Sequence, residues 1–440
     1  MHSDSNLRLK RWALALPGTL AFASALLLTA AQANAETIAI YAGKLLAVPG
    51  QQPLEQHTVL IEDGIIKSVT PGFNEVPTAS QTIDLKNSFV MPGLMDMHVH
   101  IQFEISPKND SENLRMSSEE IGMRSIHFGK KTLLAGFTTV RDVGSDEQQM
   151  YALRKAVNEG WVDSPRIIAA GGVGITGGHS DVSGMKHDLL DFYTSKQICD
   201  GPYDCRRAAR RAVKFGGDLI KVSATGGVLT DRDTGTGQQM ALDELKEIVQ
   251  AAKSMGKKVA AHAHQEDGII AALKAGVASI EHGSYANEEA FALFKQTGAY
   301  LVPTLLAGDT VVQMANESDF LSEEIKAKAI KVGGDMKGNF AKAYQAGVNI
   351  AFGTDSGVSR HGINAQEAVL MFEAGMPAMD ILKSATVNAA DLIDQSAALG
   401  TLERGKAADI IATHGSPLDD ISELLDVDFV MKAGKVYKQQ

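Results

Sequence analysis

The 440-residue sequence contains only two cysteines, which excludes a small fold held by several disulfides and a zinc site built from four thiolates. Basic residues are also scarce: 42 Lys and Arg stand against 53 Asp and Glu, so the net charge is −11. An acidic chain without a basic run is not typical of nucleic-acid binding, and we expect no nucleic-acid partner. The hydrophobic fraction of 44% and the charged fraction of 22% are those of an ordinary globular protein.

Long apolar runs are confined to the N-terminus. Three basic residues precede position 12, residues 12–31 are almost wholly apolar, and residues 33–35 read Ala-Asn-Ala. This order is typical of a Sec signal peptide over residues 1–35, cleaved after Ala35. An uncleaved membrane anchor is the alternative, because the apolar run approaches the length that spans a bilayer. We therefore expect a secreted protein, periplasmic or extracellular, with no stable membrane insertion after the signal is removed.

The two cysteines lie close together in the sequence. Cys199 and Cys205 stand on either side of Gly201-Pro202, in a segment that resembles a loop entering a helix. Export would place them in a compartment that permits disulfides. We predict a disulfide between them, with two unpaired thiols as the alternative. Neither cysteine has the spacing to histidine expected of a catalytic nucleophile.

The expected mature chain begins and ends with β-like segments. Residues 37–69 contain short apolar runs, and Asp63-Gly64 between two of them is a hairpin signal. After Leu399 the pattern is β-like again. We expect residues 36–91 and 396–440 to form one small β-sandwich domain, since the termini of a domain often lie close together.

Residues 92–395 are predicted to form a separate barrel domain. Short apolar runs alternate there with amphipathic segments, and this alternation favours a parallel sheet. The eight runs are 89–95, 137–142, 166–170, 219–222, 259–262, 279–281, 299–303 and 349–352. Eight units over roughly 270 to 300 residues match a (β/α)8 TIM barrel, so the fold class is α/β. A doubly wound sheet is the alternative, but it needs a Gly-rich turn after its first strand, where this sequence has Met-His-Val-His.

Five of the twelve histidines fall at the expected C-terminal ends of barrel strands, where barrel active sites lie. They are His98, His100, His262, His264 and His282. Lys221 ends the fourth strand and Asp355 follows the eighth. Singly, each residue has a structural interpretation, such as a buried ion pair for Lys221 or a helix cap for Asp355. Their convergence at five of eight strand ends favours a metal site.

Several motifs resemble the signatures of a known family. Residues 92–100 resemble the P-G-x-x-D-x-H-x-H opening of the amidohydrolase superfamily, and residues 400–410 resemble its G-x-[IL]-x-x-G-x-x-A-D closing motif. The similarity covers residues 36–440. It extends to the imidazolonepropionase-like branch, which includes Xaa-Pro and Xaa-Arg/Lys dipeptidases and ochratoxinase-type carboxypeptidases. The segments that carry this finer resemblance are 177–179, 220–227, 261–264 and 280–284.

The resemblance implies two Zn²⁺ ions per chain, bridged by a carboxylated Lys221. The histidines of the first strand would bind the more buried ion together with Asp355, which would also be the catalytic acid and base. The six ligands would be His98, His100, Lys221, His262, His282 and Asp355. His262 is preferred to His264 because it matches the H-A-[HY] pattern of the family. Neutral imidazoles and carboxylates are suitable zinc ligands, whereas an ammonium has no lone pair until it is carboxylated.

The activity implied by the resemblance is hydrolysis of the amide bond before a C-terminal amino acid. The enzyme would be a dipeptidase or carboxypeptidase that also takes N-acyl amino acids such as ochratoxin A. A substrate carboxylate needs hydrogen-bond donors or cations near the metals. The candidates are His179, His264, Arg232, Arg360 and His361. A small-molecule substrate and a homo-oligomer, such as an octamer, are also implied.

Three rival functions remain. A mononuclear deaminase on this scaffold uses the glutamate of an H-x-x-E motif, but this chain has Gln265 at that position. Lys221 would also have no function in a mononuclear deaminase. A hydrolase of cyclic amides or lactones would use the same ligands. A catalytically silent binding protein would be expected to have lost ligands, and all six positions are present.

Overall fold

The computed structural model describes residues 36–183, 185–230 and 235–440, and residues 36–440 form one compact unit. The predicted signal peptide and Arg232 lie outside the described residues. Within the described part of the chain, no helix is both long enough and apolar enough to cross a membrane.

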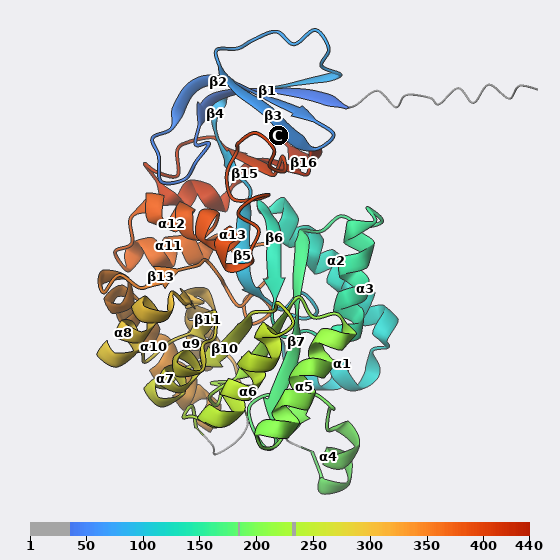
Figure 1. The fold of residues 1–440 in the computed structure, drawn as a ribbon, viewed down its shortest axis with the longest axis vertical. Coiled ribbons are helices and arrows are strands. Elements are labelled where there is room, and N and C mark those ends of the chain that lie inside the picture. Colours follow the sequence, from blue (N-terminus) through green and yellow to red (C-terminus); the bar gives the residue numbers. More distant parts are fainter. Residues whose placement is uncertain (1–35, 184, 231–234) are drawn as a thin grey trace, which may run out of the picture. The chain divides into compact units, whose positions relative to one another are not determined.

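A seven-stranded sheet joins the two ends of the described chain (Figure 1). Its order is β16-β15-β14-β4-β1-β2-β3, and only the β1–β4 pair is parallel. The strands are β1 (Thr37–Leu45), β2 (Leu54–Glu62), β3 (Ile65–Pro71), β4 (Gln81–Pro92), β14 (Ile410–Thr413), β15 (Val427–Lys432) and β16 (Lys435–Gln439). The expected Asp63-Gly64 hairpin joins β2 to β3.

This sheet curls so that its two halves enclose one apolar core. The backbone of Ile66 in β3 exchanges hydrogen bonds with Gly405 and Lys406, just before β14 (2.8 and 2.9 Å). Side chains from both halves, such as Ile40 of β1 and Phe429 of β15, pack in the same buried cluster. The N- and C-terminal segments therefore share one sheet beside the barrel, as the predicted fold class requires.

The second sheet is parallel and has the order β13-β12-β11-β10-β9-β7-β6-β5. Its strands are β5 (Leu94–Val99), β6 (Phe137–Asp142), β7 (Arg166–Ile175), β9 (Leu219–Ser223), β10 (Val259–Ala263), β11 (Ser279–His282), β12 (Tyr300–Val302) and β13 (Asn349–Ile350), with β8 (Ile198–Cys199) paired beside β7. The segment after β13 returns to β5: Met97 N donates to Phe352 O (2.8 Å) and Asp355 N donates to His98 O (2.7 Å). This contact brings the two edges of the sheet together, and the predicted barrel is confirmed.

Helices cover the outside of the barrel (Figure 1). They are α1 (Asn109–Arg115), α2 (Ser118–Leu134), α3 (Glu147–Asn158), α4 (His187–Tyr193), α5 (Pro202–Phe215), α6 (Leu242–Lys253), α7 (Glu266–Ala275), α8 (Glu288–Thr297), α9 (Leu305–Glu317), α10 (Glu323–Gln345), α11 (Gln366–Glu373), α12 (Ala378–Ser384) and α13 (Val387–Leu392), and a 3₁₀ turn spans Ile421–Leu425. Local sequence sets several ends. A Ser117/Glu120 capping box starts α2, and Gly216, in the left-handed conformation, ends α5.

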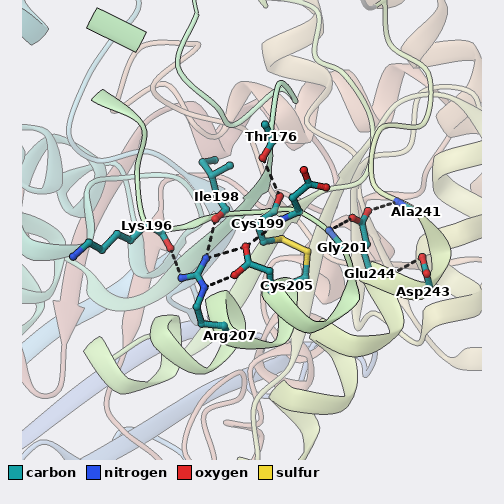
Figure 2. Close-up of a disulfide and its surroundings, with 12 residues drawn as sticks. Thr176, Lys196, Ile198, Cys199, Gly201, Cys205, Arg207, Ala241, Asp243 and Glu244 are labelled. Atoms are coloured by element: carbon teal, nitrogen blue, oxygen red, sulfur yellow. Dashed lines mark hydrogen bonds and ion pairs between the residues drawn. A yellow bond between two sulfur atoms is a disulfide. The ribbon is translucent and has the colours of Figure 1, made fainter. Parts of the chain in front are cut away.

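Cys199 and Cys205 form a disulfide between β8 and the first turn of α5 (Figure 2). Both cysteines are buried. The segment between them is tied down a second time, because Gly201 N donates to Glu244 of α6 (2.8 Å). The disulfide thus fastens β8 to the helical layer.

Reduction of this disulfide is expected to lower the free energy of unfolding by about 2 kcal/mol, because the crosslink closes only a short loop. The measurement is a denaturant melt with and without dithiothreitol. The Cys199→Ser/Cys205→Ser double variant is the control. The sequence has no other cysteine, so the unfolding midpoint of this variant should not change when dithiothreitol is added. An unchanged wild-type midpoint under reduction would contradict the expectation.

Candidate active site and metal centre

A cavity of about 430 Å³ opens at the C-terminal ends of the barrel strands. Its lining includes the six ligand positions expected from the sequence: His98, His100, Lys221, His262, His282 and Asp355. His179 and His264 line it as well. The barrel explains why these residues meet, because the C-terminal ends of its parallel strands all surround one site. The structure therefore brings these eight residues together.

The first cluster consists of His98, His100 and Asp355, whose potential ligand atoms all lie within 4.8 Å of one another. Oδ1 of Asp355 lies 2.9 Å from Nε2 of His100 and 3.4 Å from Nε2 of His98. This Oδ1 is buried, yet it makes no hydrogen bond of acceptable geometry. Three donor atoms facing one point in this way suit a cation between them.

The tautomer of His98 is set by a buried carboxylate. Nδ1 of His98 donates to Oε2 of Glu281 (2.9 Å), which leaves the Nε2 lone pair free for a ligand. The other oxygen of Glu281 accepts from Arg141 Nη2 (2.8 Å), and Arg141 Nε donates to Met97 O (2.6 Å). Burial raises the pKa of Glu281, but the charge of Arg141 and the His98 hydrogen bond outweigh it and lower the pKa to about 2. A buried ion pair therefore orients this histidine.

The second cluster consists of His262, His264 and His282. Nε2 of His262 lies 3.2 Å from the carbonyl oxygen of Gly226, which can only accept, so Nδ1 of His262 keeps its lone pair. Nδ1 of His282 pairs with Thr304 Oγ1 (2.7 Å), and Nδ1 of His264 pairs with Ser284 Oγ (2.8 Å). A hydroxyl can donate or accept, so only the His262 tautomer is fixed by its partner. All three rings are close enough to share one ion.

Lys221 lies between the two clusters on β9. In the described part of the chain, its ammonium has no hydrogen-bond partner and no ion pair. The pKa of Lys221 is lowered, mainly by burial and also by the positive charge of Arg141. The negative charges of Glu281 and Asp355 raise it, but their effect is smaller. Lys221 is partly exposed to the cavity. An amine without a partner there fits conversion to a carbamate, which would turn a cation without a lone pair into an anionic oxygen ligand.

The histidines are held neutral, as metal ligation requires. Burial lowers the pKa of His98 to about 4 and that of His264 to about 3, and it places the pKa values of His262 and His282 well below the usual range. His100 differs: burial lowers its pKa, but Asp355 outweighs burial and raises it. The donor set as a whole fits two divalent ions better than it fits an empty cavity.

Three residues at the C-terminal end of the barrel have a strained backbone. His282, Thr304 and Asp355 adopt positive φ angles of 71°, 52° and 58°, a region that residues other than glycine rarely occupy. His282 is the last residue of β11, and Thr304 and Asp355 follow shortly after β12 and β13. Strained conformations of this kind persist where the surrounding structure enforces them, typically at functional sites.

A buried aspartate fixes the two ends of the site to each other. Asp96 accepts hydrogen bonds from the backbone of His98 and Thr354 (both 3.1 Å), from Thr354 Oγ1 (2.6 Å) and from Asn364 Nδ2 (2.8 Å). It thereby ties the H-x-H segment to the residue before Asp355. Gly144 serves the same site by leaving room, since a Cβ there would overlap the His100 ring.

The predicted substrate contacts divide into three groups. The His179 ring stacks on His262 (4.5 Å between centroids), and its Nδ1 pairs with Thr230 Oγ1. Burial lowers its pKa to about 4, so it is a neutral hydrogen-bonding group and not a cation. His361 is not brought to the cavity: it stacks on Phe128, and its Nε2 pairs with Phe103 O (3.0 Å). Arg232 lies outside the described residues, and Arg360 is exposed and does not line the cavity.

The model of the amidohydrolase family matches residues 89–437 of this chain. The chain belongs to the amidohydrolase family. Among its relatives, ochratoxinase of Aspergillus niger is 32% identical over 438 residues, which cover 94% of this chain and 89% of the relative.

Solved structures support the same family assignment. A Xaa-Pro dipeptidase with bound methionine in the active site has a TM-score of 0.88 and 40% identity, covering 91% of this amidohydrolase and all of the other chain. A prolidase complexed with N-methylphosphonate-L-proline has a TM-score of 0.82 and 30% identity, covering 92% and 100%. The predicted resemblance to the superfamily and to its ochratoxinase and dipeptidase branch is thus confirmed. The amidohydrolase is a hydrolytic enzyme of the class that acts on amide bonds.

Glu281→Gln is expected to weaken metal binding by about 10- to 100-fold, because the amide no longer orients His98 as a charged acceptor. The metal dissociation constant, measured by chelator competition, checks this. Glu403→Gln is the matched control, since that carboxylate is half exposed on the surface. A Glu281→Gln variant that keeps its melting temperature and its metal affinity would overturn the role assigned to this carboxylate.

Proposed function

We propose that this amidohydrolase is a secreted binuclear zinc enzyme that hydrolyses the amide bond before a C-terminal amino acid. The observation that carries the proposal is that Lys221, without a hydrogen-bond or ion-pair partner in the described part of the chain, lines the same cavity as two histidine clusters, one of which includes Asp355. His98, His100 and Asp355 would hold one ion, and His262 and His282 the other. A carboxylated Lys221 would bridge them.

The chain's own residues account for the proton transfers. When bound by these residues, zinc would supply Lewis-acid polarisation of the substrate carbonyl and would bring the pKa of a bound water towards ~7. Asp355 is held as a carboxylate: burial raises its pKa, but its interactions with the neighbouring His98 and His100 outweigh burial and lower it. Its oxygens can take the proton of the attacking water and return it to the leaving amine nitrogen. An amine is a poor leaving group until it is protonated, so this return step is essential.

The relatives point to the amino-acid leaving group. Ochratoxinase, a Xaa-Pro dipeptidase and a prolidase are all at least 30% identical to this chain. The rival deaminase is disfavoured because Gln265 stands where an acid would be needed, and its side chain is bonded to Thr236. Two further parts belong to the proposal. Export after cleavage at Ala35 rests on the sequence, and assembly into a homo-oligomer rests on the resemblance to the family.

The test is amino-acid release from a panel of dipeptides and N-acyl amino acids. The enzyme is the chain without residues 1–35, purified with zinc and bicarbonate, and its metal content is read on the same sample. We expect release from a subset of the panel by protein that holds about two metals per chain. Two metals without release would move the substrate to lactones or cyclic amides. Absence of both metal and release would favour a silent binding protein.

A further inference from the structure

The cavity has two chemically different walls beside the ligand residues. One wall comes from α9, α10 and the loop after β9, and it is wholly apolar. Val311 of α9 forms a buried cluster with Ala329 of α10, and Val228, Leu229 and Val358 pack against that cluster. Charged side chains among the described lining residues are confined to Lys221 and Asp355, at the ligand end. This apolar wall is therefore one continuous surface.

Two glycines allow the helices of this wall to lie close together. A Cβ on Gly333 of α10 would stand 2.5 Å from Gly308 O on α9, and a Cβ on Gly308 would stand 2.8 Å from Met336 Sδ. Both glycines line the cavity. Larger residues at either position would push α9 and α10 apart, so the depth of the apolar wall is set by this close approach.

The second wall is formed around β7, β8 and β9, and it carries the polar side chains of Ser180, Gln197 and Ser223 among apolar residues of β7 and β8. Ser180 Oγ and Ser223 Oγ are hydrogen-bonded (2.6 Å), and Gln197 lies beside Gly172, where an added Cβ would stand 3.4 Å from the Gln197 amide oxygen. Gln197 directly precedes β8, the strand that the disulfide fastens to α5. Hydroxyl and amide groups can donate to a carboxylate.

We infer that the apolar wall binds the acyl half of the substrate and selects an uncharged apolar group, whereas the polar side chains of the second wall, Ser180, Gln197 and Ser223, face the carboxylate of the leaving amino acid. The inference rests on the proposed function and adds to it the chemistry of the acyl group. An apolar wall without a hydrogen-bond partner excludes charged or strongly polar acyl side chains, because they would lose their hydration without compensation. Longer apolar acyl chains gain from burial.

The experiment uses Val311, whose side chain lines the apolar wall. Val311→Phe should reduce kcat/KM for substrates with large apolar acyl groups by about 10-fold or more, as a steric change in an apolar pocket does. Substrates with a small acyl group should change by less than about 3-fold, since they do not reach the filled space. Val311→Ala should act in the opposite direction and favour longer acyl groups. Gln313→Phe is the matched control, because Gln313 is exposed on the same helix and bonds to Asp309.

Two substrate series separate the halves of the substrate. In one, the acyl group varies over a fixed leaving amino acid; in the other, the leaving amino acid varies. The inference expects the Val311 variants to change the order of preference in the acyl series alone. A changed order in the leaving series, an unchanged order in both, or wild-type preference for charged acyl groups would overturn it and leave the proposed hydrolase intact.

A binding measurement covers the case in which no member of either series is hydrolysed, an outcome that counts against the proposed function. Calorimetry then compares a branched or aromatic carboxylic acid with acetate, each titrated into the metal-loaded protein. Tighter binding of the apolar acid, weakened about 10-fold by Val311→Phe and unaffected by Gln313→Phe, would support the apolar subsite. Equal binding of the apolar acid to wild type and Val311→Phe would overturn it.

Discussion

Lys221→Ala is expected to lower kcat/KM for amide hydrolysis by at least about 10³-fold, because loss of one electrostatic group at a reacting centre alone costs 10²–10³. The variant removes the proposed bridge between the two clusters, so metal content should fall below that of the wild type. The fold should survive. In the described part of the chain the Lys221 ammonium has no hydrogen-bond or ion-pair partner to lose, and the side chain is partly exposed to the cavity.

Two comparisons make the Lys221 result specific. Lys331→Ala removes an exposed lysine on α10 that pairs only with Tyr285 and Asp335, and it should leave activity and metal content unchanged. Added formate or acetate should restore part of the activity of Lys221→Ala, because a small carboxylate can enter the space and replace the lost oxygens. Full hydrolysis by Lys221→Ala with two metals bound would exclude the bridging role.

The barrel could be predicted from the sequence because its strands are buried on both faces and separated by amphipathic helices. The run at 137–142 coincides with β6, for instance. The first expected run, 89–95, was wrong in extent, because it spans the end of β4 and the start of β5. Only Gly93 separates these strands, and every residue around it is buried. Hydrophobicity alone cannot show that the chain passes there from one sheet to the other.

The positions of the candidate ligands were predictable for the same reason, since strand ends converge on one face. The residues that orient these ligands could not be predicted from the sequence. Arg141 and Glu281 look like isolated charges within short strands, and only the fold shows that they are paired and that Glu281 orients His98. A charged residue inside an otherwise apolar strand was the available signal.

The residues that line the cavity walls were harder to predict from the sequence. Val311 and Met336 have the spacing of ordinary core residues on amphipathic helices, and no local pattern distinguishes a cavity wall from a helix–helix contact. His361 shows how loop positions depend on packing. Its place after the eighth strand suggested a substrate contact, but the ring is turned towards Phe128. Side-chain direction in loops depends on tertiary packing, which the sequence pattern does not encode.

Asp355→Asn is expected to reduce kcat by about 10²- to 10⁴-fold, the range of a general acid or base. The amide has nearly the same shape as the carboxylate but cannot accept the proton of the attacking water. It also places a neutral group beside His98 and His100, so metal content must be measured with the rate. Asp335→Asn, on the exposed face of α10, is the matched control and should behave as wild type.

The dependence on the leaving group separates the two duties of Asp355. An amino-acid amide must be protonated as the bond breaks, whereas an activated anilide such as a p-nitroanilide departs with less help. If Asp355 returns the proton to the leaving nitrogen, Asp355→Asn should be impaired less on the anilide than on the dipeptide at equal metal occupancy. Equal impairment on both substrates would confine Asp355 to water activation or metal binding, and another group would have to supply the proton.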